Sequence, residues 1–132
     1  IPKTGTVFIS VREPDKTKAL VKLAHLLIKK GFLIIATEGT SEFLNLNNIK
    51  SSYINKVHQG QPHIVDLIRK GEIDLIINTT EGKQSIEESF SIRAEAVIRN
   101  VTYYTSLEAS IATMDAFDYF NMVSVNRLQD FY

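Results

Sequence analysis

Two segments of the sequence join a short apolar run to small hydrogen-bonding residues and a glycine. They read Leu33-Ile34-Ile35-Ala36-Thr37-Glu38-Gly39-Thr40 and Leu75-Ile76-Ile77-Asn78-Thr79-Thr80-Glu81-Gly82. In a parallel sheet this transition marks the carboxyl end of a strand, where open α/β folds bind their ligands. Hydroxyls, amides and the free N–H groups of a helix start suit a phosphate, because the positive end of the helix dipole faces it. The two segments therefore predict one anion pocket.

Lysines can supply the charge that such a pocket needs. Lys16 stands four residues before Leu20, so we expect it on the inward stripe of a helix, pointing toward the strand ends. Lys56 follows a short apolar segment that lies between the two strand ends in the sequence, and Lys83 comes just after the second glycine. Six polar residues would converge with these lysines at the sheet edge: Ser10, Thr37, Thr40, Asn78, Thr79 and Thr80.

Each of these residues also has a plainer structural role. Threonine and asparagine after a strand are common in turns and at helix N-caps, and a lysine in a first helical turn is often solvated. The convergence of three signals at one predicted edge favours binding over these roles. The other lysines of the first helix are assigned to its solvated face: Lys18, Lys22, Lys29 and Lys30. The histidines lack metal-ligand spacing with a carboxylate and are interpreted as structural or solvent-facing: His25, His58 and His63.

Strand and helix periodicities alternate along the chain. Strands are expected at residues 6–11, 32–36, 53–57, 74–78 and 102–104, with an edge strand at 123–127. Helices are expected at residues 15–30, 40–46, 63–70, 86–100 and 107–119, with Pro62 in the first turn of the third. Strands separated by helices imply right-handed crossovers. The predicted fold class is α/β: a Rossmann-like three-layer sandwich, with a mostly parallel sheet of about five strands covered by helices on both faces.

Composition indicates one small domain. The 132 residues are 44% hydrophobic, which suffices for a core, and 15 basic residues balance 15 acidic ones. Without a positive excess, neither nucleic acid nor an anionic membrane is an expected partner. The absence of cysteine and of a long apolar run suits a cytoplasmic location. Because the chain starts at Ile1 without methionine, we interpret it as part of a longer polypeptide, with residues 1–5 ending a linker and residues 6–132 forming the domain.

Four motifs carry a resemblance to a known family. They are Ser10-Val11-Arg12-Glu13-Pro14-Asp15-Lys16, Ala36-Thr37-Glu38-Gly39-Thr40, Asn55-Lys56-Val57-His58-Gln59-Gly60-Gln61-Pro62-His63-Ile64 and Ile76-Ile77-Asn78-Thr79-Thr80-Glu81-Gly82. In this spacing they resemble the C-terminal allosteric domain of the carbamoyl-phosphate synthase large chain, which belongs to the methylglyoxal-synthase-like group. The resemblance extends from about Gly5 to Phe117. It implies the Rossmann-like fold that the periodicity also predicts.

The resemblance further implies that the domain binds effectors and catalyses nothing. UMP as inhibitor and IMP as activator would share overlapping sites, and ornithine would bind at the interface with the neighbouring synthetase domain. The implied nucleotide site comprises Ser10, Lys16, Thr37, Thr40, Lys56, Asn78, Thr79, Thr80, Lys83 and Glu88. In the family pattern Glu88 is an aspartate and Lys83 an arginine, while Thr105 corresponds to the ornithine-contacting threonine. No metal or cofactor is expected in this domain.

The implied parent chain is a ligase that uses ATP with Mg or Mn. It works with a glutaminase small subunit and makes carbamoyl phosphate for pyrimidine and arginine biosynthesis. Nucleotide binding would change how this domain sits against the synthetase domains of the same chain.

Related proteins offer alternatives. Methylglyoxal synthase uses an aspartate to take a proton from dihydroxyacetone phosphate, but Gln61 stands at that position, and a carboxamide is no general base. His63 would have to replace it. The urea-cycle synthase, which binds N-acetylglutamate, carries a tryptophan near the position of Lys56, whereas this chain has none. The cyclohydrolase half of the bifunctional purine enzyme differs after the second strand. A regulatory module is therefore predicted, with methylglyoxal synthase activity as the alternative.

Overall fold

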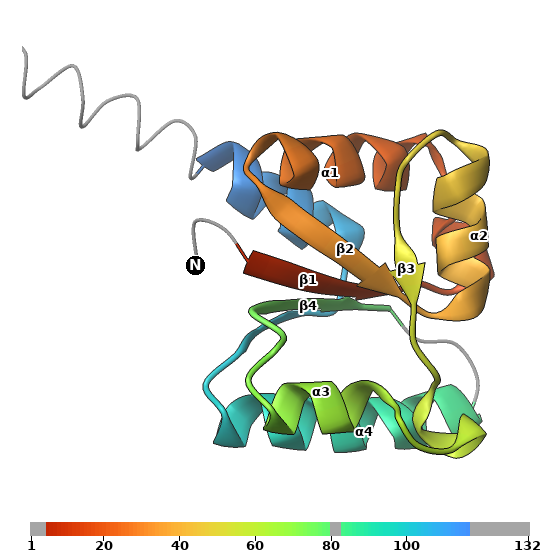
Figure 1. The fold of residues 1–132 in the computed structure, drawn as a ribbon. Helices are drawn as coiled ribbons and strands as arrows, with labels where there is room; N and C mark the ends of the chain where they lie inside the picture. Colours follow the sequence, from red (N-terminus) through yellow and green to blue (C-terminus); the bar gives the residue numbers. More distant parts are fainter. Residues whose placement is uncertain (1–4, 80–82, 117–132) are drawn as a thin grey trace, which may run out of the picture.

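The computed structural model of the protein describes residues 5–79 and 83–116 (Figure 1). One sheet has the strand order β3-β2-β1-β4-β5, and every neighbouring pair is parallel. The strands are β1 (Gly5–Ser10), β2 (Phe32–Ala36), β3 (Ser52–Tyr53), β4 (Leu75–Asn78) and β5 (Thr102–Tyr104). The helices are η1 (Glu13–Asp15), α1 (Lys18–Lys29), α2 (Glu38–Leu46), η2 (Val57–Gln59), α3 (Ile64–Arg69), α4 (Lys83–Ile98) and a helix over residues 107–116. The predicted α/β class is confirmed.

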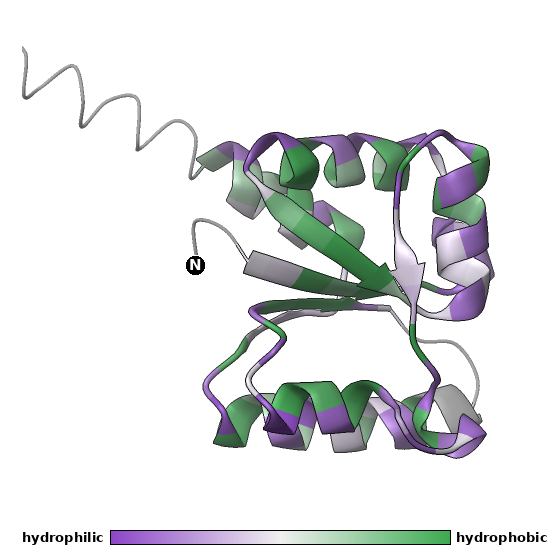
Figure 2. Ribbon diagram, viewed as in Figure 1, coloured by the Kyte–Doolittle hydropathy of each residue, from purple (hydrophilic) through white to green (hydrophobic). Residues whose placement is uncertain are grey.

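Helices cover both faces of the sheet. One core packs β1 and β4 against α1, α2 and the helix at 107–116, and the other packs the opposite faces of the same strands against α3 and α4 (Figure 1). Successive residues of a strand point to opposite faces, so Val7 and Ile9 enter the first core while Phe8 enters the second. The middle parts of the central strands, Val7 to Ile9 and Leu75 to Ile77, are therefore apolar at successive positions (Figure 2), as their apolar runs in the sequence predicted.

The strand order changes direction between β1 and β4. The chain builds the sheet outward from β1 through β2 to β3, then returns to place β4 on the other side of β1. In open α/β folds such a switch point leaves a crevice at the carboxyl ends of the two strands. Ser10 and Asn78 stand there and are paired in register. Ser10 and Asn78 therefore lie where folds of this topology bind their ligands.

The start of the first helix differs from the prediction. Instead of one helix over 15–30, η1 covers Glu13–Asp15 and α1 begins at Lys18, after the extended N-cap Thr17. The turn is closed when the Lys16 N–H donates to the Glu13 carbonyl at 3.0 Å. Pro14 lies in the first turn of η1, where its missing N–H costs nothing. Lys16 therefore lies outside α1, and its predicted place on the inward stripe of that helix is wrong.

Other element boundaries differ as well. The second helix begins at Glu38 rather than at Thr40. The strand expected at 53–57 is limited to Ser52–Tyr53, because the chain then turns into η2. Helix α3 begins at Ile64, and Pro62 precedes it, since His63 is the N-cap and donates its N–H to Asp66 Oδ2 at 2.9 Å. The expected edge strand at 123–127 lies outside the described residues. Within the described part of the chain, no helix is both long and apolar enough to traverse a membrane.

Candidate functional site

A cluster of buried hydroxyl groups joins the ends of β1 and β2. The Thr37 hydroxyl, 3.3 Å from Ser10 Oγ and 3.2 Å from Thr40 Oγ1, donates toward these two oxygens. Thr40 Oγ1 also accepts a hydrogen bond from the Val11 N–H at 3.2 Å. Thr37 and Thr40 are 4% and 1% exposed. Three predicted residues are thus brought together, and their bonds fix the loop after β1 against the start of α2.

The N-terminus of α2 faces this cluster. Thr37 is the N-cap, yet its side chain forms no capping bond because its hydroxyl is turned toward Ser10 and Thr40. The first N–H groups of a helix have no partner within the helix, and they carry the positive end of its dipole. Thr40, at the third position of α2, therefore does not cap this helix. The first turn remains available to an anion.

Lys16 lies against the same helix start. A Cβ atom on Gly39 would be only 3.1 Å from Lys16 Nζ, so the glycine lets the ammonium approach the first turn closely. The Lys16 side chain is 16% exposed and pairs with Glu13, whose side chain is 81% exposed. A half-buried cation beside the positive end of a helix needs an anion close by, and among the described residues Glu13 supplies one from the exposed side. Although its helical placement was wrong, the prediction that Lys16 points toward the strand ends agrees with this contact.

Asn78 is held by hydrogen bonds to two elements on the second face of the sheet. Its Nδ2 donates to Ser89 Oγ of α4 and to Tyr103 Oη of β5, both at 2.8 Å. Because both amide protons are used, Asn78 offers a ligand its Oδ1 acceptor. An acceptor suits a ribose hydroxyl or a base N–H and does not suit a phosphate. The expectation that Asn78 adds to a donor-rich phosphate site is thus replaced by a different chemical role.

Thr79 connects the strand ends to a second cavity. Its N–H donates to the Ser10 carbonyl at 2.9 Å, and its Oγ1 accepts from the Arg12 N–H at 3.0 Å. A cavity of about 270 Å³ on its other side is lined by Arg12, Asp15, Thr79, Thr105, Ser106, Leu107 and Glu108. Arg12 and Asp15 form an ion pair there at 2.9 Å. Thr105 thus lines a cavity that contains none of the three residues of the hydroxyl cluster.

The remaining predicted residues lie farther along the same edge or outside the described structure. Lys56 is the exposed N-cap of η2, and no hydrogen bond in the described part of the chain joins its side chain to the hydroxyl cluster. Glu88, on α4, pairs with Nδ1 of His58, and its side chain is 14% exposed. Thr80 lies outside the described residues, as does the side chain of Lys83.

Several contacts at this site have no local signal in the sequence. His58, expected to be structural or solvent-facing, is 45% exposed and pairs with Glu88 across 30 positions of sequence. The Tyr103 hydroxyl accepts a hydrogen bond from Asn78. Glu13 pairs with Lys16, and Ser89 accepts a hydrogen bond from Asn78. Long-range partners of this kind have no local pattern, whereas the strand-end threonines have one.

The segment around Gln61 and His63, where a methylglyoxal synthase would carry its catalytic aspartate, contains no side chain identified as a general base. Gln61 is exposed, and a carboxamide does not take protons at neutral pH. The buried Nδ1 of His63 has no hydrogen-bond partner within the described residues, and Asp66 Oδ2 lies 3.6 Å away. Among the described residues, no group of three or more His, Asp or Glu side chains is placed to hold a metal ion.

Comparison with known proteins identifies the class to which this fold and site belong. The family model described as the MGS-like domain matches residues 19–105. The chain therefore belongs to the MGS-like domain family. A crystal structure of methylglyoxal synthase from Elizabethkingia anophelis aligns with a TM-score of 0.64 at 17% identity, covering 86% of this chain and 78% of that one. At this identity the likeness supports the fold.

Curated relatives narrow the class to one kind of parent protein. Over 129 residues, 98% of its length, the chain is 43% identical to the carbamoyl phosphate synthase large chain of Xanthomonas axonopodis pv. citri. Over 118 residues, 89% of its length, it is 46% identical to the large chain of Myxococcus xanthus. The chain spans only 12% and 11% of the lengths of these two relatives. The predicted resemblance to the MGS-like domain of this large chain is confirmed.

Proposed function

We propose that this chain is the effector-binding domain of a carbamoyl-phosphate synthase large chain, and that its strand-end pocket binds the phosphate of UMP or IMP. The position of Lys16 carries the proposal, because its ammonium lies against an uncapped helix start with Gly39 leaving the space open. A phosphate beside this contact would accept hydrogen bonds from the helix N–H groups and from the lysine. Lys56 and Lys83 are proposed as further cations, and Thr80 as a further hydroxyl.

The base and ribose would lie toward α4. Asn78 Oδ1 and the Glu88 carboxylate are acceptors for their N–H and O–H groups. UMP would act as the inhibitor and IMP as the activator of the parent enzyme. Both effectors would share the phosphate contacts, so they would compete for one pocket.

Ornithine is proposed for the cavity beside Thr105. The lining of this cavity combines the carboxylates of Asp15 and Glu108 with the Arg12 guanidinium and three hydroxyls. An amino acid with two ammonium groups and one carboxylate can find opposite charges in such a lining. The neighbouring synthetase domain would complete the site.

The parent activity is also part of the proposal. The named relatives are large chains of carbamoyl phosphate synthase, and such a parent would be a cytoplasmic ligase that supplies pyrimidine and arginine biosynthesis. ATP, with Mg or Mn, and the glutaminase small subunit would act outside this domain. This domain would bind effectors without catalysing a reaction.

Thermal unfolding and calorimetry test the binding proposal directly. A ligand at a hundredfold excess over its Kd stabilises the folded state by about 2.7 kcal/mol, so UMP or IMP should raise the unfolding midpoint by several degrees. Lys16→Ala should abolish most of this shift, while Lys22→Ala on the solvated face of α1 should leave it intact. If neither nucleotide raises the unfolding midpoint, or if Lys16→Ala and Lys22→Ala reduce the increase equally, the proposed pocket is wrong.

Dihydroxyacetone phosphate distinguishes this function from methylglyoxal synthase. Incubation of the chain with this compound should release no phosphate above background, because Gln61 supplies no base. If turnover survives in Gln61→Ala and disappears in His63→Ala, then His63 acts as the base, and the chain is an enzyme of the synthase type.

A further inference from the structure

Helix α4 carries apolar side chains on two opposite sides. Its inner side buries Ile92 and Ala96 in the second core, at 5% and 1% exposed. On its outer side Ile86, Phe90 and Val97 are 59%, 75% and 75% exposed. Residues spaced by four and seven positions share one face of a helix, so these three form a single stripe, which we call the outer stripe of α4. A surface helix of a self-contained domain is normally polar on this side.

The outer stripe is the densest exposed apolar surface on any one element of the described chain. Half of the large exposed hydrophobic side chains among the described residues belong to α4, including Ile98 at its end. The others, Ile28, Leu33, Leu46 and Tyr53, come from four different elements, and of these Leu46 and Tyr53 line one cavity. Isolated exposed apolar residues are ordinary, but a contiguous patch marks an interaction surface. Within the described residues nothing covers it. A partner is needed to bury it.

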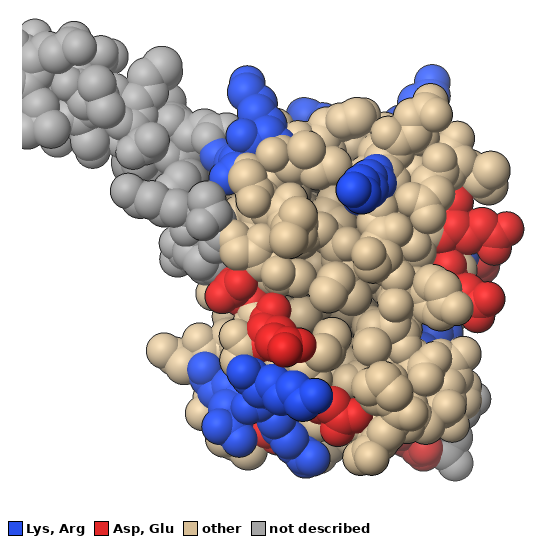
Figure 3. All heavy atoms as spheres, in the orientation of Figure 1, with Lys and Arg blue, Asp and Glu red and all other residues tan. Residues whose placement is uncertain are grey.

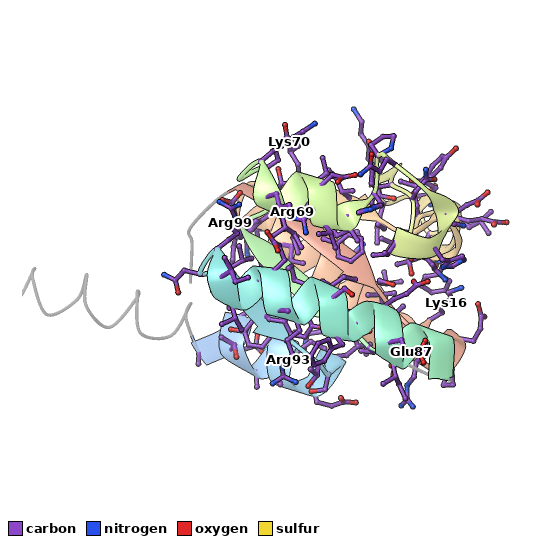
Figure 4. All side chains as sticks on the ribbon, turned by 90° about the horizontal axis from the view of Figure 1, so that it is seen from below. Lys16, Arg69, Lys70, Glu87, Arg93 and Arg99 are labelled. Atoms are coloured by element: carbon purple, nitrogen blue, oxygen red, sulfur yellow. The ribbon has the colours of Figure 1, made fainter. Side chains whose placement is uncertain are left out.

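The inner side of the same helix holds the candidate effector site. Ser89 accepts a hydrogen bond from Asn78, and Glu88 pairs with His58. Asn78 also binds Tyr103, and the Arg93 guanidinium lies 5.8 Å over the ring of Tyr103. Arg93 stands on the outer stripe by its spacing from Phe90 and Val97. A short chain of contacts therefore runs from Asn78 through Tyr103 to Arg93 on α4, and Figure 4 labels Arg93 on that helix.

The position and charge of the stripe favour one occupant. The chain is only 12% as long as its large-chain relatives, so a much larger body is available to cover it. The helix at 107–116 packs on the opposite face of the sheet, in the core that contains Met114, so the last described residues lie in the layer away from α4. At the carboxyl end of α4, Arg69 and Arg99 share the buried carboxylate of Glu95, and Lys70 lies beside them. Figure 4 shows Arg69, Lys70 and Arg99 at one end of the helix layer and Lys16 toward the other end, and Figure 3 shows a basic patch on the lower part of the molecule.

We propose that the outer stripe of α4 docks this domain onto the synthetase part of the same large chain, and that the Asn78 hydrogen bonds to Ser89 and Tyr103 link this interface to effector binding. The proposal rests on the proposed function for its choice of partner. The docked face should be apolar at its centre and acidic where it meets Arg69, Lys70 and Arg99. Interfaces between domains of one chain have this mixed character.

Hydrogen–deuterium exchange tests the docking without using any effector. The amides of α4 are followed in the 132-residue chain and in the complete large chain that contains it. Docking should slow their exchange in the complete chain by about tenfold or more, since an added interface stabilises the helix against local opening. Equal exchange in the two proteins would overturn the proposal. If the amides of α4 already exchange as slowly in the 132-residue chain as in the complete chain, the synthetase part is not what covers the stripe, and the proposal is overturned. An exchange rate that depends on protein concentration would then indicate a second copy of the chain as the cover, and a rate that does not would indicate the residues beyond 116.

Variants test the link to regulation. Phe90→Ser with Val97→Ser should leave the Kd for UMP in the 132-residue chain within about twofold, because both side chains face away from the pocket. In the complete large chain this double variant should retain basal carbamoyl phosphate synthesis and lose the response to UMP and IMP. Leu46→Ser, which removes an equally exposed side chain from α2, is the matched control and should respond normally. If the double variant still responds to UMP and IMP, the docking proposal is refuted. If the wild-type chain binds neither nucleotide, the proposed function is refuted instead, and the exchange experiment alone decides on docking.

Discussion

Replacing Gly39 by alanine should separate the stability of α2 from its ability to bind phosphate. Gly39 occupies the second position of α2, and a Cβ atom there would meet Lys16 Nζ at 3.1 Å. The Lys16 ammonium is the end of a flexible side chain, so it can move by a few tenths of an ångström and the fold should survive. The methyl group would then push the ammonium away from the first turn, beside which a phosphate is proposed to bind.

The two expected effects have opposite signs. Alanine is preferred over glycine by up to about 1 kcal/mol in a helix, and by about half of that near its end, so stability should rise slightly. The unfolding midpoint of a domain of this size should increase by about 2 °C. Nucleotide affinity should fall about tenfold, which corresponds to about 1.4 kcal/mol, because the displaced ammonium and the added methyl group weaken the charge-assisted bonds.

Calorimetric titration with UMP and IMP, combined with thermal unfolding of the unliganded chain, measures both quantities. Glu42→Ala, an exposed change on the same helix, is the control for a general effect on α2 and should leave the Kd unchanged. A Gly39→Ala chain that is more stable and binds nucleotide as tightly as the wild type would refute the reasoning. It would mean that the phosphate lies elsewhere along the strand ends.

Three further outcomes are expected. Lys16→Ala should weaken nucleotide binding by about 1.5–3 kcal/mol, while Lys22→Ala should change it by less than the error of the titration. Thr40→Ala should lower the free energy of unfolding by about 1–3 kcal/mol, since it leaves the buried Val11 N–H without its acceptor, and Thr40→Ser should restore most of the loss in a denaturant titration. Tyr103→Phe removes one of the two acceptors of the Asn78 amide, so it should lower the melting temperature and weaken nucleotide binding, and unchanged values for both would remove Tyr103 from the site.

The fold could be predicted from the sequence because its signals are local. The runs at Phe32–Ala36 and Leu75–Ile77 are apolar at every position, which indicates strands inside the sheet, and both strands are found there. The convergence of Ser10, Thr37 and Thr40 followed from the predicted topology, since parallel strands end at the same edge. The ends of helices and strands were less predictable where the backbone makes an irregular turn. The turn at Lys16 between η1 and α1 is an example, because the helical spacing of residues in the sequence continues through it.

The partners of the site residues could not be predicted in the same way. The sequence identifies Asn78 as polar at a strand end, but it does not reveal that Ser89 and Tyr103 use both amide protons. Nor does it show that Lys16 reaches Gly39, since that contact depends on how η1 turns the chain toward α2. Tertiary packing determines these contacts across 11 to 30 positions of sequence in the case of Asn78–Ser89, Asn78–Tyr103 and His58–Glu88.

In the proposed site the hydrogen-bond donors lie near the phosphate and the acceptors lie near the base, and this separation limits how two nucleotides could regulate the parent enzyme. The donors near Lys16 and α2 would hold a phosphate, which UMP and IMP have in common, so contacts at that end cannot favour opposite states of the parent enzyme. Two ligands produce opposite responses only through contacts that differ between them. In the proposed pose, these are the contacts of the base with Asn78 Oδ1 and with the Glu88–His58 pair, which lie along α4. The sign of each effector would thus be determined at the helix whose outer stripe is proposed to meet the synthetase domains, while the phosphate end would contribute affinity alone.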